Sequence, residues 1–233
     1  MGRPIPGIHS RASALDFVRD KVRKHAGDQP KMKILGLELS TARGGLTWLD
    51  ADVDLAREWA NDRKNSAALF ENLDHVTKQF GAPEIIVVGL GPGSYAGTRI
   101  AISAAIGLQV SSRARLIGFP SICAMESAEY CVIGDARRET FFFARIRANE
   151  LVEGPTLFTE EELKRKLATL EADLPIFCSE SLPQFPNAMI RYPSALVLAR
   201  LAQCPQRSFS LPPLEPIYLR EPHTTMPKVA SSK

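Results

Sequence analysis

Apolar and polar residues follow two different periods along this chain, and the periods predict strands and helices in turn. Lys33–Leu39 and Glu84–Leu90 are nearly continuous apolar runs, typical of strands covered on both faces. Within Asn65–Phe80, Leu69 and Leu73 belong to a series of apolar residues at steps of three and four, which predicts a helix with one apolar face. The same reasoning predicts further strands at Leu46–Leu49, Leu116–Phe119, Tyr130–Gly134, Thr140–Arg147 and Leu174–Cys178, and further helices at Thr98–Val110, Glu160–Leu170 and Ser194–Ala202.

Strands interleaved with helices indicate an α/β protein, and a second strand that returns directly after the first makes its sheet mixed. Residues 1–31 precede this pattern and hold seven of the 29 basic residues but only three of the 26 acidic ones. Within them Leu15, Val18 and Val22 recur at helical spacing. We expect residues 1–31 to be a flexible basic extension of a fold that begins at Met32.

Charge and hydropathy exclude two classes of function. Beyond residue 31 the chain is close to neutral, which does not suit a freestanding nucleic-acid binder, so any role on RNA needs a partner. No apolar run approaches the roughly 20 residues of a membrane span, and the N-terminus lacks the apolar segment of a secretory signal. We therefore expect a cytoplasmic protein that does not associate with a membrane.

The four cysteines do not suggest a metal site or a disulfide framework. Cys123, Cys131, Cys178 and Cys204 are scattered, with no CxxC pair and no histidine at ligand spacing. Two of them lie in apolar stretches, where a thiol behaves as a small buried hydrophobic group. We expect free thiols and no bound metal.

The most informative segment is the loop Gly91-Pro-Gly-Ser-Tyr-Ala-Gly97, between a predicted strand and a predicted helix. Glycines and free N–H groups at a helix start can hold an anion, so Gly91, Gly93, Ser94 and Arg99 are candidate contacts to a nucleotide or another anion. The spacing matches neither the dinucleotide-binding nor the P-loop pattern. It therefore leaves the function of the loop open.

The helix after the loop carries a stripe of small residues. Gly97, Ala101 and Ala105 recur every fourth residue, beside an apolar stripe of Ile102 and Ile106. Small residues allow close approach of another element, either a partner helix or this protein's own sheet. Periodicity alone does not decide between these two.

At this loop the chain resembles the bacterial TsaB (YeaZ) family, whose pattern is GPGSFTGxRIG. Gly91 to Ser94, Gly97 and Arg99-Ile100 match that pattern, whereas Tyr95 and Ala96 depart from it. Three further segments resemble family motifs in the same order, namely Ile34–Thr41, Asp135-Ala-Arg137 with Glu139, and Pro216–Arg220. The resemblance thus extends from Met32 to the C-terminal tail.

The resemblance implies an actin-like ATPase (RNase H-like) fold, an α/β architecture of two lobes with mixed sheets flanked by helices. We expect lobes at residues 32–119 and 120–233, the second being smaller. It also implies a non-catalytic adaptor without a cofactor of its own, which pairs with the TsaD subunit, joins the TsaE ATPase, forms a homodimer when alone, and meets tRNA only in the complex. ATP or ADP would bind at the interface of that complex, which transfers threonylcarbamoyl to N6 of adenosine 37 in tRNAs that read codons beginning with A.

The resemblance also implies which residues contact the partner. They are Gly97, Arg99, Ala101, Ile102 and Ala105 after the loop, and Leu69 and Leu73 in the preceding helix. We expect Ala105→Trp to abolish the complex and to leave the fold intact.

Departures from the family pattern leave alternatives open. Glu38 stands where actin-like kinases hold a metal through an aspartate, and Asn65 where family members often have a histidine. A small-molecule kinase would use Glu38 and Asp135, although Asp135 with Arg137 and Glu139 could equally form a surface ion-pair group at a strand turn. A homodimeric scaffold without a tRNA role is the third reading, whereas a metallopeptidase is excluded because no two histidines lie within four residues of each other.

Overall fold

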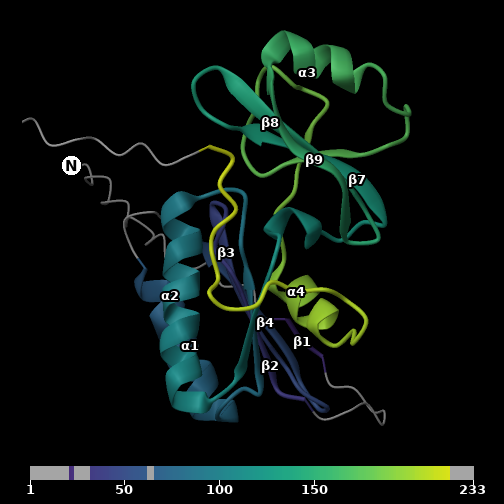
Figure 1. Ribbon diagram of the computed structural model, residues 1–233. Coiled ribbons are helices and arrows are strands. Elements are labelled where there is room, and N and C mark those ends of the chain that lie inside the picture. The colour runs from purple at the N-terminus through teal and green to yellow at the C-terminus, as the bar shows by residue number, and fades with distance from the viewer. Residues whose placement is uncertain (1–20, 24–31, 62–65, 221–233) are drawn as a thin grey trace, which may run out of the picture.

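The computed structural model describes residues 21–23, 32–61 and 66–220, which form two lobes, each built on its own sheet (Figure 1). The first sheet has the order β1-β4-β3-β2-β5-β6 and the second the order β11-β10-β7-β8-β9. The strands of the first sheet are β1 (Lys21–Arg23), β2 (Ile34–Glu38), β3 (Arg43–Leu49), β4 (Asp54–Ala60), β5 (Ile85–Gly89) and β6 (Arg115–Phe119). Those of the second are β7 (Glu129–Asp135), β8 (Thr140–Arg147), β9 (Glu150–Thr159), β10 (Ile176–Cys178) and β11 (Met189–Ile190), and the helices are α1 (Ala67–Phe80), α2 (Tyr95–Ser112), α3 (Glu160–Leu167) and α4 (Ala195–Ala202).

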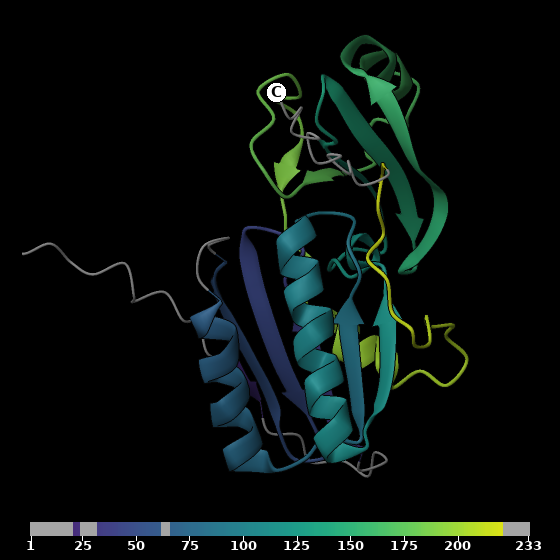
Figure 2. The same ribbon diagram turned by 60° about the vertical axis from the view of Figure 1, so that its left-hand side comes forward.

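The first sheet is mixed, as predicted, because β2 pairs antiparallel with β3 and parallel with β5. Helices α1 and α2 cover one face of this sheet and α4 covers the other (Figure 2). Leu35 and Leu37 of β2 therefore pack under α1 and α2, whereas Gly36 faces α4, where an added Cβ would lie 2.5 Å from the Ala195 carbonyl oxygen. Two covered faces account for the continuous apolar run of β2.

Helix α3 covers the second sheet, and reciprocal hydrogen bonds cap its N-terminus. The Thr159 side chain accepts a hydrogen bond from the Glu162 N–H, and the Glu162 side chain accepts one from the Thr159 N–H, forming a capping box. Acidic residues fill the first turn and basic residues the last, which suits the helix dipole. Leu163 is its buried anchor against the core of the second lobe.

Helix α4 joins the two lobes in space. It follows residue 119 and so belongs to the part of the chain that we expected to form the second lobe, yet it packs on β2, β3 and β5 of the first sheet. Leu198 of α4 shares one hydrophobic core with Val87 of the first sheet and with Val132 and Phe142 of the second. The lobes are therefore held together by a common core.

Several predicted elements need correction. Lys21–Arg23 is a strand that pairs antiparallel with β4, so the helix that the spacing indicated is wrong at Val22. The other residues of 1–31 and Asn65 lie outside the described residues. Strands β4, β9 and β11 were not predicted.

None of the helices in the described part of the chain is long and apolar enough to cross a bilayer.

Candidate functional site

The loop between β5 and α2 packs closely on the chain just after β2. Ser94 caps α2, its Oγ accepting a hydrogen bond from the Gly97 N–H at 3.2 Å. An added Cβ would lie 2.2 Å from the Ser40 carbonyl oxygen at Gly93, and 2.0 Å from the Leu39 carbonyl oxygen at Gly97. These glycines are therefore required by the close approach of two backbones.

This packing uses N–H groups that an anion would need. The Gly91 N–H donates to Ser121 Oγ at 2.9 Å, and the Ser94 N–H donates to a carbonyl oxygen just after β2. The predicted anion contact is therefore wrong for the backbone N–H groups of Gly91 and Ser94. It stays a prediction for Gly93, for the side chain of Ser94 and for Arg99, which line openings at the surface.

The stripe of small residues on α2 faces this protein's own sheet. Ala101 and Ala105 have no exposed surface, and Gly97 and Ile102 are also buried. The predicted partner contacts at these four positions are therefore wrong, because no partner can reach side chains that the sheet already covers. Small residues here allow α2 to lie close to β5 and β2.

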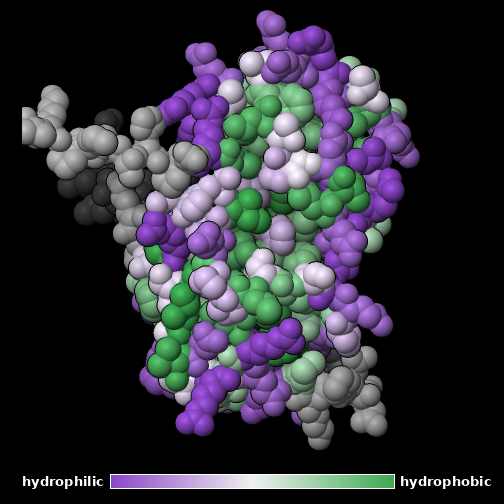
Figure 3. All heavy atoms as spheres, viewed as in Figure 1, coloured by the Kyte–Doolittle hydropathy of each residue, from purple (hydrophilic) through white to green (hydrophobic). Residues whose placement is uncertain are grey.

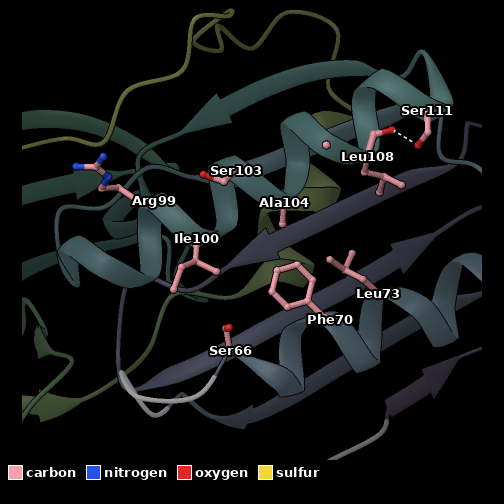
Figure 4. A pocket seen from close by; sticks show the side chains of 10 residues that line it. Ser66, Phe70, Leu73, Arg99, Ile100, Ser103, Ala104, Leu108 and Ser111 are labelled. Carbon is pink, nitrogen blue, oxygen red and sulfur yellow. Dashed lines mark hydrogen bonds between the residues drawn. The ribbon is translucent and has the colours of Figure 1, made fainter.

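The outer sides of α1 and α2 form a groove of about 730 Å³. Phe70 and Leu73 point from α1 towards Ile100, Ala104 and Leu108 of α2 (Figure 4). Of the residues predicted to contact a partner, the groove brings together Leu73 and Arg99, whereas Leu69 is buried in the core. The lining residues are Ser66, Phe70, Leu73, Arg99, Ile100, Ser103, Ala104, Gly107, Leu108 and Ser111.

Large apolar side chains extend this surface beyond the groove. Phe70 is 52% exposed, Ile106 45% and Val110 80%. Apolar residues also gather along the flank of the lower lobe, where these helices lie (Figure 3). Phe70 and Val110 were not predicted to contact a partner, because the helical period does not show on which side of each helix the sheet lies.

A second opening, of about 670 Å³, lies between the lobes. Gly93, Tyr95 and Asn61 line it from the first lobe, whereas Asp135 lines it from the end of β7 and Arg138 from the turn that follows. Asp135 and Arg137 form an ion pair of 3.1 Å there, as the surface ion-pair reading expects, and Asp135 also lines the cleft that the kinase reading requires.

The C-terminal segment Pro216–Arg220 crosses from one lobe to the other along this cleft. The Ile217 N–H donates to the Leu90 carbonyl oxygen at 2.8 Å, and the Arg220 guanidinium donates to Thr140 Oγ1. This segment therefore binds the end of the first sheet as well as the second sheet.

Two tyrosines hold Arg99 in place at the start of α2. The Arg99 guanidinium donates to the Tyr95 hydroxyl and lies 5.0 Å from the centre of the Tyr95 ring. The Tyr218 ring lies 5.4 Å from the Tyr95 ring, centre to centre. Burial and the neighbouring Tyr95 raise the pKa of Tyr218 above its ordinary value. This cluster stands where the groove and the cleft meet, since Arg99 lines the groove and Tyr95 the cleft.

Glu38 is the last residue of β2. Its side chain is fully buried, the Ser40 N–H donates to its Oε1 at 2.6 Å, and it passes so close to Gly89 that an added Cβ there would lie 1.8 Å from its Oε2. Burial raises the pKa of Glu38, against hydrogen bonds from Ser40 and Ser121 that lower it. A carboxyl group that is enclosed and held towards its neutral form does not suit metal binding from the cleft.

The cysteines are free thiols, as predicted. Cys123, Cys131 and Cys178 are buried and Cys204 is exposed. Burial raises the pKa of Cys131 to about 11, so this thiol is not activated. In the described part of the chain, no cluster of three or more histidine, cysteine or acidic side chains could hold a metal ion.

Comparison with known proteins shows a likeness in structure. No protein-family model and no curated protein matches the sequence. An uncharacterised Pseudomonas aeruginosa protein with similarity to peptidase YeaZ is 22% identical, with a TM-score of 0.64 over 81% of this chain and 100% of that one. YeaZ from Pseudomonas aeruginosa is 20% identical, with a TM-score of 0.57 over 73% of this chain and 90% of that one. The protein therefore has the fold of the YeaZ-like proteins, the actin-like architecture of two mixed sheets flanked by helices that the family resemblance implies.

Proposed function

We propose that this chain is a non-catalytic adaptor that docks a TsaD-type subunit in the groove between α1 and α2. In that complex it supports the transfer of threonylcarbamoyl to N6 of adenosine 37 in tRNAs that read codons beginning with A. The fold of the YeaZ-like proteins and the sequence matches from Ile34 to Arg220 support the proposal.

The groove is the observation on which the proposal depends. Apolar surface that is concave and flanked by exposed large side chains is typical of a protein-binding site. Two helices that present side chains at helical spacing to one groove accept a third helix, as in helix-in-groove recognition. The occupant that fits is therefore a helix of another subunit.

The remaining parts of the proposal follow from an adaptor role. Glu38 does not line the cleft between the lobes, so the acidic group best placed by sequence for metal-dependent phosphoryl transfer is not positioned for it. ATP or ADP would bind at the interface with the partner, TsaE would join the same complex, and tRNA would be contacted only there. The protein would act in the cytoplasm and form a homodimer through the same groove when alone.

Size-exclusion chromatography with light scattering tests the adaptor role on the full chain, alone and mixed with the TsaD subunit of the same organism. We expect a co-eluting heterodimer with the wild type and none with Phe70→Glu, which places a charge in the groove. Val152→Glu is the matched control, because Val152 is 51% exposed but lies on β9 of the other lobe. A wild type that never co-elutes with TsaD would overturn the proposal.

A small-molecule kinase is the second candidate, and the cleft between the lobes favours it. An opening of about 670 Å³ lies in the range of small-ligand sites. Titration calorimetry with MgATP distinguishes the two candidates. Tight binding by the isolated chain would favour the kinase, and its absence would favour the adaptor.

A further inference from the structure

The groove between α1 and α2 contains one charged side chain. Of the ten residues that line it, nine are apolar or neutral, and the tenth is Arg99. Arg99 lies at the end where α2 begins, and Ser111 lies near the opposite end (Figure 4). An occupant therefore meets apolar surface along most of the groove and a cation at one end.

Arg99 has no acidic partner among the described residues. The ion pairs in that part of the chain join other side chains. The Arg99 guanidinium contacts the hydroxyl and the ring of Tyr95, and the Tyr218 ring packs against the Tyr95 ring. Its charge is therefore not balanced by a carboxylate in this part of the chain.

The two tyrosines also order the guanidinium before any partner arrives. A long side chain loses rotamer entropy when an interface immobilises it, and a side chain that is already held loses less. Arginine and tyrosine are also the residue types that dominate binding energy at protein interfaces. The cluster of Tyr95, Arg99 and Tyr218 thus has the properties of a specific anchor point.

We infer that the helix docking in this groove presents an apolar face that ends in a carboxylate side chain, which Arg99 receives. The inference rests on the proposed function and specifies the chemistry of the partner. A carboxylate fits the planar guanidinium with two parallel hydrogen bonds. A nucleic-acid phosphate would also pair with Arg99, but it would leave the apolar length of the groove unfilled, so the groove favours a protein helix.

Arg99→Gln tests the inference through the affinity of the full chain for the TsaD subunit, measured at low and at high salt. We expect Arg99→Gln to weaken binding by at least about 30-fold and to flatten its salt dependence, because the carboxylate is then buried without its cation. Arg99→Lys keeps the charge but loses the paired hydrogen bonds, so its affinity should lie between the two. Arg115→Gln is the matched control, since Arg115 is exposed at the start of β6, beyond the far end of α2.

A charge swap then identifies the acidic residue. Arg99→Glu should abolish binding, and an acid-to-lysine variant at one position of the partner's docking helix should restore it. Restoration by one such variant and by no other supports the inference.

Three results would overturn it. Wild-type affinity and salt dependence in Arg99→Gln would show that the cation contacts no acid, although loss of binding in Phe70→Glu would still support docking in the groove. An effect of Arg99→Gln only when tRNA or nucleotide is present would assign Arg99 to a phosphate. Absence of any complex with the wild type would overturn the proposed function, and the inference with it.

Discussion

Ala105→Trp should destabilise the first lobe rather than block a partner. Ala105 has no exposed surface and lies on the side of α2 that packs against the first sheet. The indole ring has no free volume to enter, so α2 must shift away from β5, or the surrounding side chains must leave their preferred rotamers.

The magnitude follows from the packing. Overpacking of a filled core typically costs about 1–3 kcal/mol for small additions, so a whole indole should lower the free energy of unfolding by about 3 kcal/mol or more. For a chain of this size each kcal/mol shifts the melting temperature by about 2–4 °C. A fall of about 6–12 °C or more is therefore expected.

Thermal unfolding followed by circular dichroism measures this effect, and Ile106→Trp is the control. Ile106 is the next residue of the same helix but is 45% exposed, so its ring can lie on the surface and stability should change by about 0.5 kcal/mol or less. Equal melting temperatures for Ala105→Trp and the wild type would refute the assignment of this side of α2 to the core.

Three other predictions concern stability. Glu38→Gln should make the free energy of unfolding less dependent on pH above pH 4.5. Burial raises the pKa of Glu38 in the folded state, so the protonated carboxyl stabilises the fold at low pH and this contribution is lost as the pH rises through that pKa. Equal melting temperatures for both proteins at every pH would contradict this. Thr159→Ala removes the capping box of α3 and should lower stability by about 1 kcal/mol in urea denaturation, and no change would show that the cap is dispensable. Gly93→Ala should destabilise the protein, since the new methyl group would lie 2.2 Å from the Ser40 carbonyl oxygen, whereas Gly107→Ala, with nothing within 4 Å, should stabilise α2 by about 0.5–1 kcal/mol; the opposite order of melting temperatures would refute this reasoning.

Sequence reasoning predicted well the helices and strands that are buried on one face or on both faces, because burial then determines the order of apolar and polar residues. Strand β8 spans Thr140–Arg147, the range predicted. Helix α2 starts at Tyr95 rather than Thr98, because the cap at Ser94 adds a turn before the apolar period begins. Strand β4 was missed because charged residues interrupt it, among them Arg57, whose guanidinium bonds the side chain of Asn72 in α1.

The candidate site was less predictable than the fold. The stripe of Gly97, Ala101 and Ala105 is visible in the sequence, but which side of α2 meets the sheet depends on contacts between distant residues. The groove depends on the relative placement of two helices, and therefore Phe70 and Ile100 become recognisable only once α1 and α2 lie together. Arg99 is the residue for which motif and geometry agree, since it stands in the matched loop pattern and in the groove.

The position of α4 has a consequence for how this protein is made on the ribosome. One face of the first sheet lacks its helix until α4 (Ala195–Ala202) has been synthesised. The strands on which α4 packs, β2, β3 and β5, are complete by Gly89. Without α4, Ile34 and Val87 lack part of their cover while the whole second sheet is translated. Exposed apolar strands of this kind are prone to aggregate, so the first lobe should need a holding chaperone during translation, and a chain truncated before α4 should be insoluble.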